Sequence, residues 1–264
     1  MRRDAITAPE LTAMKGRGEK ISVLTAYDYT WGRLIDESGI DVALVGDSLG
    51  MVVLGYDTTL DVTMDDMVRH TAAVGRGAKR ALVVADMPFL SYQVSDEEAI
   101  RNAGRLIQEG GAGAVKLEGG ARIAKIVRRI VDIGIPVFGH IGMTPQSVHQ
   151  FGGYKTQGTD AEKAAQIEED AYSLQDAGVC AIVLEKIPAG LAKSISGSLI
   201  VPTIGIGAGP DCDGQVLVTH DILGMYDKFT PPFAKQYCNL WQITLEAFQA
   251  YNSDVKEGRF PEQK

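Results

Sequence analysis

The sequence predicts an α/β protein of the (β/α)8 (TIM) barrel class with extra helices at both ends. From residue 20 onward, short runs rich in Val, Ile, Leu and Ala alternate with segments of helical period, as in repeated βα units around a parallel sheet. Several of these runs are apolar throughout, which is typical of strands covered on both faces. The 264 residues match the ~250 of such a barrel, so one domain over residues 1–264 is expected.

The repeat supplies enough strands to close a barrel. Eight are expected, at residues 21–26, 42–46, 82–85, 114–117, 136–139, 181–184, 201–204 and 215–219. Two of the intervening helices have start signals, because Ser95 precedes Glu98 and Thr159 precedes Glu162 at the spacing of a capping box. An amphipathic segment follows each signal, which indicates a helix that packs against the barrel.

Two segments lie outside the βα repeat. A short helix at about residues 9–17 is expected to cover the bottom of the barrel. One or two amphipathic helices are expected at about residues 221–257, and they carry Trp241, Phe248 and Tyr251. Aromatic residues on a terminal helix usually belong to a core or a subunit interface.

Composition excludes several classes of partner. Lys and Arg number 26 against 34 Asp and Glu, a formal net charge of −8, whereas nucleic acids and anionic membranes need a basic face. An acidic substrate would need a local cation. The three cysteines have no metal-site or disulfide spacing, which fits a reduced compartment. Residues 1–4 lack a following apolar signal region, and no membrane-length apolar run occurs, so a cytoplasmic location is expected.

Four predicted strands end in a carboxylate. The residues are Asp47, Asp86, Glu118 and Glu185, and Ser48 follows the first of them. Barrel enzymes take their catalytic groups from the carboxyl ends of the strands, so these side chains should converge on one pocket. The alternative for any single acid is a helix N-cap, a role in which Asp is common.

Crowded carboxylates repel each other unless a cation neutralises them. Oxygen ligands without His or Cys select a hard ion, and Mg²⁺ commonly uses one or two protein carboxylates. Asp47 and Asp86 are the nearest pair in barrel order and are assigned to one Mg²⁺ per subunit. Glu118, at the end of the next strand, is expected to bind the Mg²⁺ ion directly or through a water molecule.

A metal with open positions suits a 2-oxo acid, because the keto and carboxylate oxygens chelate it and the metal stabilises the enolate formed by loss of a neighbouring proton. Glu185, across the barrel from the metal pair, is the candidate base. Lys116 lies two residues before Glu118 on the same strand face. It is expected to neutralise a substrate carboxylate, or else to pair with an acid inside the barrel.

His140 follows the fifth predicted strand and is expected at the same mouth. It is a supporting candidate, since a lone histidine is more often structural than catalytic. The connections at residues 49–62 and 144–158 are long for βα loops and are candidate lids. A subunit contact would use the same glycine and aromatic residues.

A set of short motifs occurs in order along the chain: TAYDY (25–29), VGDSLG (45–50), DMPF (86–89), VKLEGG (115–120), GHIGMTPQ (139–146), FGGY (151–154) and IGIGAG (204–209). In this combination the chain resembles the ketopantoate hydroxymethyltransferase family. The resemblance spans about residues 25–221. Together the motifs are far more specific than any one of them.

The resemblance implies a barrel of the phosphoenolpyruvate-binding type, assembled as a homodecamer and active in pantothenate and hence coenzyme A synthesis. It implies that Asp47, Asp86 and Glu118 serve Mg²⁺, that Ser48 and Lys116 join the two aspartates in holding the oxo acid, and that Glu185 accepts the proton. The implied reaction transfers the one-carbon unit of 5,10-methylenetetrahydrofolate to 3-methyl-2-oxobutanoate through a Mg-stabilised enolate. The products are 2-dehydropantoate and tetrahydrofolate.

Two other functions compete with this interpretation. A metal-dependent carbon-carbon lyase or mutase of the same barrel superfamily would act on another 2-oxo acid, but it usually has a catalytic cysteine in a loop that lacks one here. An inactive barrel serving as a binding or scaffold protein would have a broken carboxylate set. In this sequence the set is complete.

Overall fold

A computed structural model describes residues 5–226, 229 and 231–262, so residues 1–4, used above to predict location, lie outside the described residues. Contacts divide the chain into two units, one ending at Val216 and the other beginning at Leu217. The first unit holds the barrel and every candidate site residue. The division does not test the single-domain expectation, which stays a prediction.

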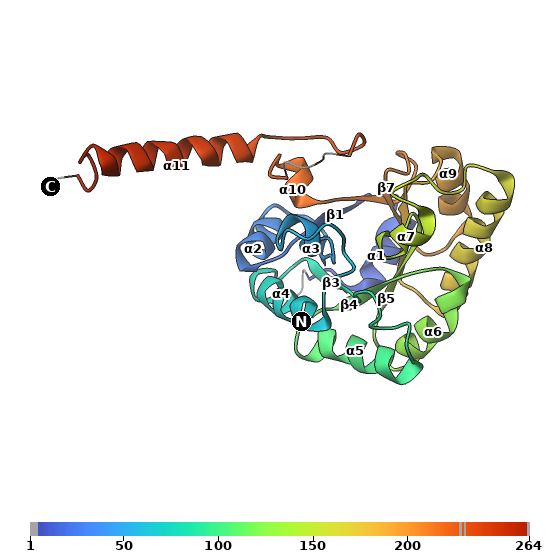
Figure 1. Ribbon diagram of the computed structural model, residues 1–264. Coiled ribbons are helices and arrows are strands. Elements are labelled where there is room, and N and C mark those ends of the chain that lie inside the picture. The colour runs from blue at the N-terminus through green and yellow to red at the C-terminus, as the bar shows by residue number, and fades with distance from the viewer. Residues whose placement is uncertain (1–4, 227–228, 230, 263–264) are drawn as a thin grey trace. The chain divides into compact units, whose positions relative to one another are not determined.

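Eight strands form a closed barrel in the order β1 to β8 (Figure 1). Adjacent strands from β1 to β8 pair in parallel. The strands are β1 Ile21–Thr25, β2 Val42–Val45, β3 Leu82–Asp86, β4 Ala114–Glu118, β5 Val137–Gly142, β6 Ala181–Glu185, β7 Thr203–Ile206 and β8 Gly214–Leu217. The predicted (β/α)8 barrel is therefore confirmed.

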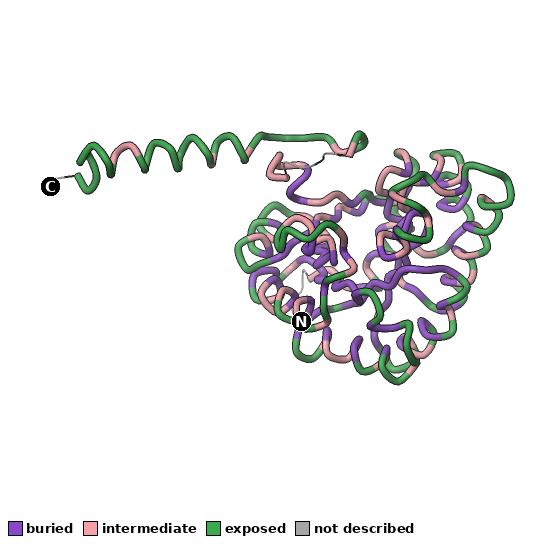
Figure 2. Tube along the Cα trace, viewed as in Figure 1, coloured by how far each residue is buried: buried purple, intermediate pink, exposed green. Residues whose placement is uncertain are grey.

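Helices follow most strands and cover the outside of the barrel. They are α2 Tyr29–Glu37, α3 Leu49–Val52, α4 Met64–Gly77, α5 Asp96–Gln108, η1 Ala121–Ile123, α6 Ala124–Asp132, η2 Pro145–Ser147, α7 Val148–Phe151, α8 Ala161–Ala177 and α9 Ala189–Ser198. The apolar faces of the helices pack on the outward-facing strand residues in one large core cluster. Figure 2 shows buried chain concentrated in this layer and in the strands.

The helix caps differ in detail from the sequence prediction. Ser95 accepts a hydrogen bond from the Glu98 N–H at 3.2 Å, as expected for an N-cap. The cap of α8 is Asp160, which accepts from the Lys163 N–H at 2.9 Å, so the prediction of Thr159 was one residue early. Asp and Thr are both good caps, and the local sequence does not distinguish them.

Every strand has bounds slightly different from those predicted, and β5, β7 and β8 differ by more than one residue; β8 ends at Leu217 instead of residue 219. β5 continues to Gly142, three residues beyond the predicted end, and this extension places His140 inside the strand. β7 begins at Thr203, after Pro202, which has no N–H to donate to a ladder. The ends of β5 and β7 were hard to predict because polar and proline residues lie there. Pairing with the neighbouring strands, rather than the local sequence, decides where such a strand ends.

The inside of the barrel is apolar at its lower end. Inward-facing residues of all eight strands form a second core cluster, which also contains Leu11 and Met14 from α1 Ala8–Gly16. Nζ of Lys15 lies 2.9 Å from the Asp213 carboxylate and 3.1 Å from the Val201 carbonyl, next to the starts of β8 and β7. The helix expected at residues 9–17 therefore closes the amino-terminal end of the barrel.

The second unit contains α10 Thr219–Ile222 and α11 Leu240–Lys256. Helices were expected over about residues 221–257. Among the residues described, only the start of this span, in α10, and its last part, in α11, are helical. α11 contains no buried residue, and its apolar stripe includes Trp241, Leu245 and Phe248. Among the helices described, none is long and apolar enough to cross a membrane.

The two long connections contain short helices. α3 begins the connection after β2, and η2 and α7 begin the one after β5. The ordered turns shorten the irregular part of each loop. Whether the loops at 49–62 and 144–158 act as lids stays a prediction.

Candidate active site

Strand register places the charged residues at the upper end of the barrel. Along β3, Leu82, Val84 and Asp86 share the inward face because side chains alternate with a period of two. Asp86 pairs in register with Lys116, and Glu118 of the same strand pairs with His140. The inward column changes from apolar to charged between Val84 and Asp86 on β3, between Ala114 and Lys116 on β4, and between Phe138 and His140 on β5.

Asp47 and Ser48 reach the site from the turn after β2. The Asp47 N–H donates to Oδ2 of Asp86 at 3.1 Å, and the Ser48 hydroxyl lies 2.9 Å from the Tyr27 hydroxyl. A Cβ on Gly46 would lie only 2.7 Å from Oγ of Ser48. Glycine at position 46 therefore permits the tight turn that brings Asp47 beside Asp86 and Ser48 beside Tyr27.

Three carboxylates and one lysine share a dry space. Asp47, Asp86 and Glu118 are each at most 4% exposed, and Lys116 is 5% exposed. Nζ of Lys116 lies 3.1 Å from Oδ1 of Asp86. Removing a charge from water is costly unless a partner compensates, so this ion pair supports the buried aspartate.

The pKa values of these groups respond to burial and to each other. Burial, followed by the charges of Asp86 and Glu118, raises the pKa of Asp47 well above its usual range. Burial also raises the pKa of Asp86, although Lys116 opposes the change. For Lys116, burial favours the neutral amine, but the surrounding carboxylates outweigh it and raise the pKa. The site thus contains more negative charge than its cations balance.

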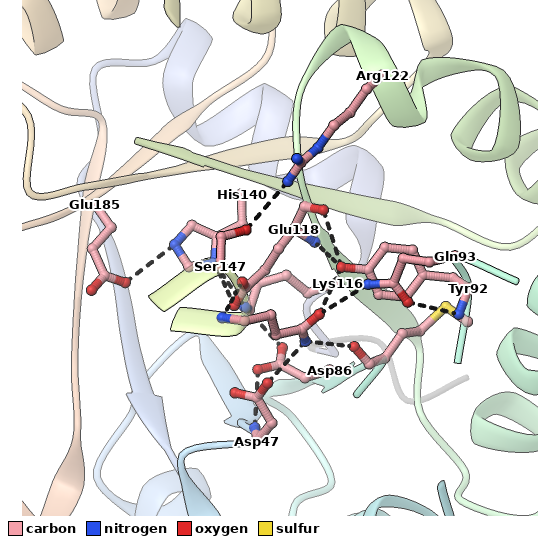
Figure 3. Close-up of polar contacts among 12 residues, drawn as sticks. Asp47, Asp86, Tyr92, Gln93, Lys116, Glu118, Arg122, His140, Ser147 and Glu185 are labelled. Atoms are coloured by element: carbon pink, nitrogen blue, oxygen red, sulfur yellow. Dashed lines mark hydrogen bonds and ion pairs between the residues drawn. The ribbon is translucent and has the colours of Figure 1, made fainter. Parts of the chain in front are cut away.

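His140 connects the carboxylate group to Glu185 (Figure 3). Its Nε2 lies 3.2 Å from Oε2 of Glu185, and its Nδ1 lies 3.5 Å from Oε1 of Glu118. Burial and the Lys116 charge lower the pKa of His140, but contacts with the Glu118 and Glu185 carboxylates outweigh them and raise it to about 9. Nδ1 also lies 3.2 Å from Nζ of Lys116, so the ring joins Lys116 and Glu118 to Glu185.

Glu185 ends β6 and is less buried than the other acids, with a side chain 13% exposed. Its neighbour in register is Gly142, whose φ of 92° is left-handed. A Cβ on Gly142 would overlap the carbonyl oxygen of Glu185. A glycine is consequently needed beside the backbone of Glu185.

Gln146 links the candidate metal ligands and was not predicted to belong to the site. Its Nε2 donates to Oδ2 of Asp47 at 2.9 Å and to the Met87 carbonyl at 3.0 Å, while its N–H donates to Oε2 of Glu118 at 2.9 Å. It lies directly after Pro145 in a motif that carried the family resemblance. That motif was the only sequence signal, because spacing along the chain does not indicate a contact across 99 residues.

Tyr92 was also missed by the sequence analysis. Its hydroxyl lies 2.8 Å from Oε1 of Gln146 and accepts a hydrogen bond from the Glu118 N–H at 3.1 Å. Burial and the charge of Glu118 raise the pKa of Tyr92 well above 10.0, so it stays a neutral hydroxyl. Its role is to fix the Gln146 amide and the end of β4.

The donor set fits a hard divalent cation. Asp47, Asp86 and Glu118 offer oxygen atoms only, and the excess of buried negative charge would be relieved by a cation. In the described part of the chain, no group of three or more His, Cys, Asp and Glu side chains is assembled as a metal cage. Mg²⁺ needs only one or two protein carboxylates and fills its other positions with water and substrate.

The fold and the site together define a class of protein. Acidic, basic and hydrogen-bonding groups meet at the carboxyl end of a closed parallel barrel, where enzymes with this fold carry out catalysis. The chain is therefore a barrel enzyme acting on a small molecule. A buried carboxylate set beside a less buried glutamate suits removal of a proton from a metal-chelating acid.

Comparison with known proteins identifies the family. The family described as "Ketopantoate hydroxymethyltransferase" matches residues 5–263. The 3-methyl-2-oxobutanoate hydroxymethyltransferase of Moorella thermoacetica is 58% identical over 262 residues, covering 99% of this chain and 97% of the relative. The chain belongs to the ketopantoate hydroxymethyltransferase family, and the expectation of a transferase is confirmed.

Solved structures with the same fold match nearly the whole chain. A structure of 2,3-dimethylmalate lyase, described as a PEP mutase/isocitrate lyase superfamily member, matches with a TM-score of 0.60 at 17% identity over 97% of this chain and 90% of that one. Phosphonopyruvate hydrolase in complex with oxalate and Mg²⁺ matches with a TM-score of 0.64 at 11% identity over 96% and 88%. At these identities the similarity establishes the fold alone.

Proposed function

We propose that this enzyme transfers the one-carbon unit of 5,10-methylenetetrahydrofolate to 3-methyl-2-oxobutanoate in the synthesis of pantothenate and coenzyme A. The two organic substrates and one water give 2-dehydropantoate and tetrahydrofolate. A proton leaves C3, a bond forms between C3 and the methylene carbon, and that carbon separates from the folate nitrogens and takes its hydroxyl from water. The names of the relatives support the hydroxymethyl transfer and the oxo acid.

The main support for the proposal is that His140 contacts both a buried acid of the site and Glu185. His140 lies between Glu118 and Glu185, at 3.5 Å and 3.2 Å. Glu185 accepts the C3 proton, and its partial exposure lets the proton pass to solvent. His140 fixes the orientation of that carboxylate.

Asp47, Asp86 and Glu118 would hold one Mg²⁺ per subunit, with Glu118 either direct or through water. When bound, the ion supplies Lewis-acid polarisation of the ketone beside the reacting carbon. The complex of a barrel of the same fold with oxalate and Mg²⁺ is consistent with this requirement. Ser48 and Lys116 join the two aspartates in positioning the oxo acid. Lys116 offsets the negative charge of the substrate carboxylate.

Exchange of the C3 proton of 3-methyl-2-oxobutanoate into D₂O tests the proposal. Proton NMR should show loss of the C3 signal with Mg²⁺ and no loss with EDTA. Absence of exchange both without folate and with added tetrahydrofolate would contradict the proposed substrate. Exchange that needs tetrahydrofolate would show that the donor site must fill first.

The competing lyase or mutase of the same superfamily is less well supported. The described cysteines are Cys180, Cys212 and Cys238, and none is among the residues that contact the carboxylate group. Formation of 2-dehydropantoate in the complete assay, without cleavage of the oxo acid, separates the two reactions.

We also propose a homodecamer in the cytoplasm. The apolar stripe of α11 supports association, because Trp241 is 51% and Phe248 68% exposed in the isolated chain. The three unpaired cysteines fit a reduced compartment.

A further inference from the structure

A cavity adjoins the carboxylate site. Its volume is about 650 Å³, and its lining comes mainly from the segments that follow β3, β4 and β5, with Leu60 from the connection after β2. Tyr92, Glu118 and Gln146 belong both to this lining and to the carboxylate site. Asp47, Asp86, Lys116 and Glu185 do not line it. The cavity therefore shares one wall with the carboxylate site.

The cavity combines apolar walls with charged groups of both signs. Phe89, Ile123 and Ile126 supply apolar surface, Arg122 and Lys125 supply cations, and Asp96 and Glu118 supply acids. In a chain of net charge −8, an anionic ligand needs a local cation that no acid already neutralises. A volume in this range, with apolar walls and a few charged groups, is typical of sites for small organic ligands.

Arg122 is the cation best placed to meet a ligand. Its Nη2 donates to the Ser147 hydroxyl at 3.3 Å, and no ion pair joins it to a carboxylate among the described residues. Lys125 instead lies 3.0 Å from Asp96, whose carboxylate also contacts Arg129. In Figure 3, Arg122 and Asp47 lie at opposite ends of the group, with Glu118 between them.

We propose that this cavity binds the one-carbon donor, with the glutamate tail of the folate at Arg122 and the pterin toward the wall formed by Tyr92, Glu118 and Gln146. This assignment rests on the proposed function, which makes a reduced folate the donor. A folate is a flat ring system joined through an aromatic spacer to a dianionic glutamate. The apolar walls suit the ring and spacer, and the guanidinium of Arg122 suits a carboxylate, which it binds in a fork geometry.

The shared wall explains how the donor would meet the oxo acid. Gln146 contacts Asp47 through Nε2 and Glu118 through its N–H, so one residue touches both the metal-ligand set and the donor cavity. A pterin against this wall would present its methylene carbon toward the chamber that contains the oxo acid. Phe89, 38% exposed, supplies an aromatic surface against which a flat ring can stack.

Binding of two ligands to three variants tests the assignment. Tetrahydrofolate, the reaction product, and tetrahydropteroate, which lacks the glutamate, are titrated calorimetrically into the full chain with Mg²⁺ and the oxo acid present. Arg122→Gln should weaken tetrahydrofolate about tenfold and leave tetrahydropteroate unchanged. Phe89→Ala should weaken both ligands about fivefold. The matched control is Arg76→Gln, an exposed arginine near the end of α4 and outside the cavity lining, which should change neither.

The outcomes separate this inference from the proposed function. If the wild-type chain binds tetrahydrofolate and Arg122→Gln leaves both affinities unchanged, or weakens both ligands equally, the cavity assignment is wrong while the folate reaction stands. If the wild-type chain exchanges the C3 proton of the oxo acid but binds neither folate, the proposed donor is wrong and the assignment fails with it. Circular dichroism and melting temperature show whether each variant is folded.

Discussion

Replacement of Lys116 by methionine gives a direct test of how the buried charges are balanced. Nζ of Lys116 lies 3.1 Å from Asp86, and both side chains are 5% exposed. At an effective dielectric constant of about 20, unit charges at this separation attract by roughly 5 kcal/mol. Breaking one side of a buried ion pair costs ~3–5 kcal/mol, because the remaining charge stays buried. We expect Lys116→Met to lower the free energy of unfolding by about 4 kcal/mol in EDTA at pH 8.

The pH dependence of this loss has a definite sign. Burial already raises the pKa of Asp86, and loss of Lys116 raises it further. An acid whose pKa is higher in the folded state favours folding at low pH, and that contribution is lost as pH rises through the folded-state pKa. The deficit of Lys116→Met should therefore be smaller at pH 5 than at pH 8.

Urea unfolding followed by circular dichroism, at one fixed protein concentration, measures the deficit. Lys193→Met is the control, since Nζ of Lys193 lies 4.0 Å from Asp211 with a side chain 70% exposed. Its effect should stay within about 0.5 kcal/mol. A deficit for Lys116→Met below about 1 kcal/mol, or one equal at pH 5 and pH 8, would refute the reasoning.

Three further predictions concern the same network. Glu185→Gln should abolish C3 proton exchange, while its affinity for the oxo acid, measured by calorimetry, should stay within about twofold of the wild-type value. Exchange at the wild-type rate would show that Glu185 is not the base. Gln146→Leu removes the side-chain donors to Asp47 and to the Met87 carbonyl, and the acceptor of the Tyr92 hydroxyl. It should cost ~2–4 kcal/mol of stability and weaken Mg²⁺ binding, and unchanged metal affinity would contradict its linking role. In EDTA, the stabilisation from His140, whose pKa is raised to about 9, should be complete below pH ~6.5 and lost as pH rises through 9. His140→Gln should flatten this slope in urea titrations, and an unaltered slope would assign it to another group.

The sequence by itself determined the barrel. Apolar runs of strand length, alternating with amphipathic helical segments, require a parallel sheet covered on both faces. Period-two alternation also placed Lys116 and Glu118 on one inward face, and both line the site in the structure. These features are local, so each can be inferred from neighbouring residues alone.

Only the tertiary structure decided how the charges are paired. The height of Asp86 beside Lys116, and of Glu118 beside His140, depends on strand register, which is set by packing of whole strands. Asp47 enters through a turn rather than by strand alternation, and Tyr92 and Gln146 meet across 54 residues. Long-range contacts of this kind leave no periodic trace along the chain. The polar links around the carboxylates, and the cavity beside them, therefore emerge only when the barrel closes.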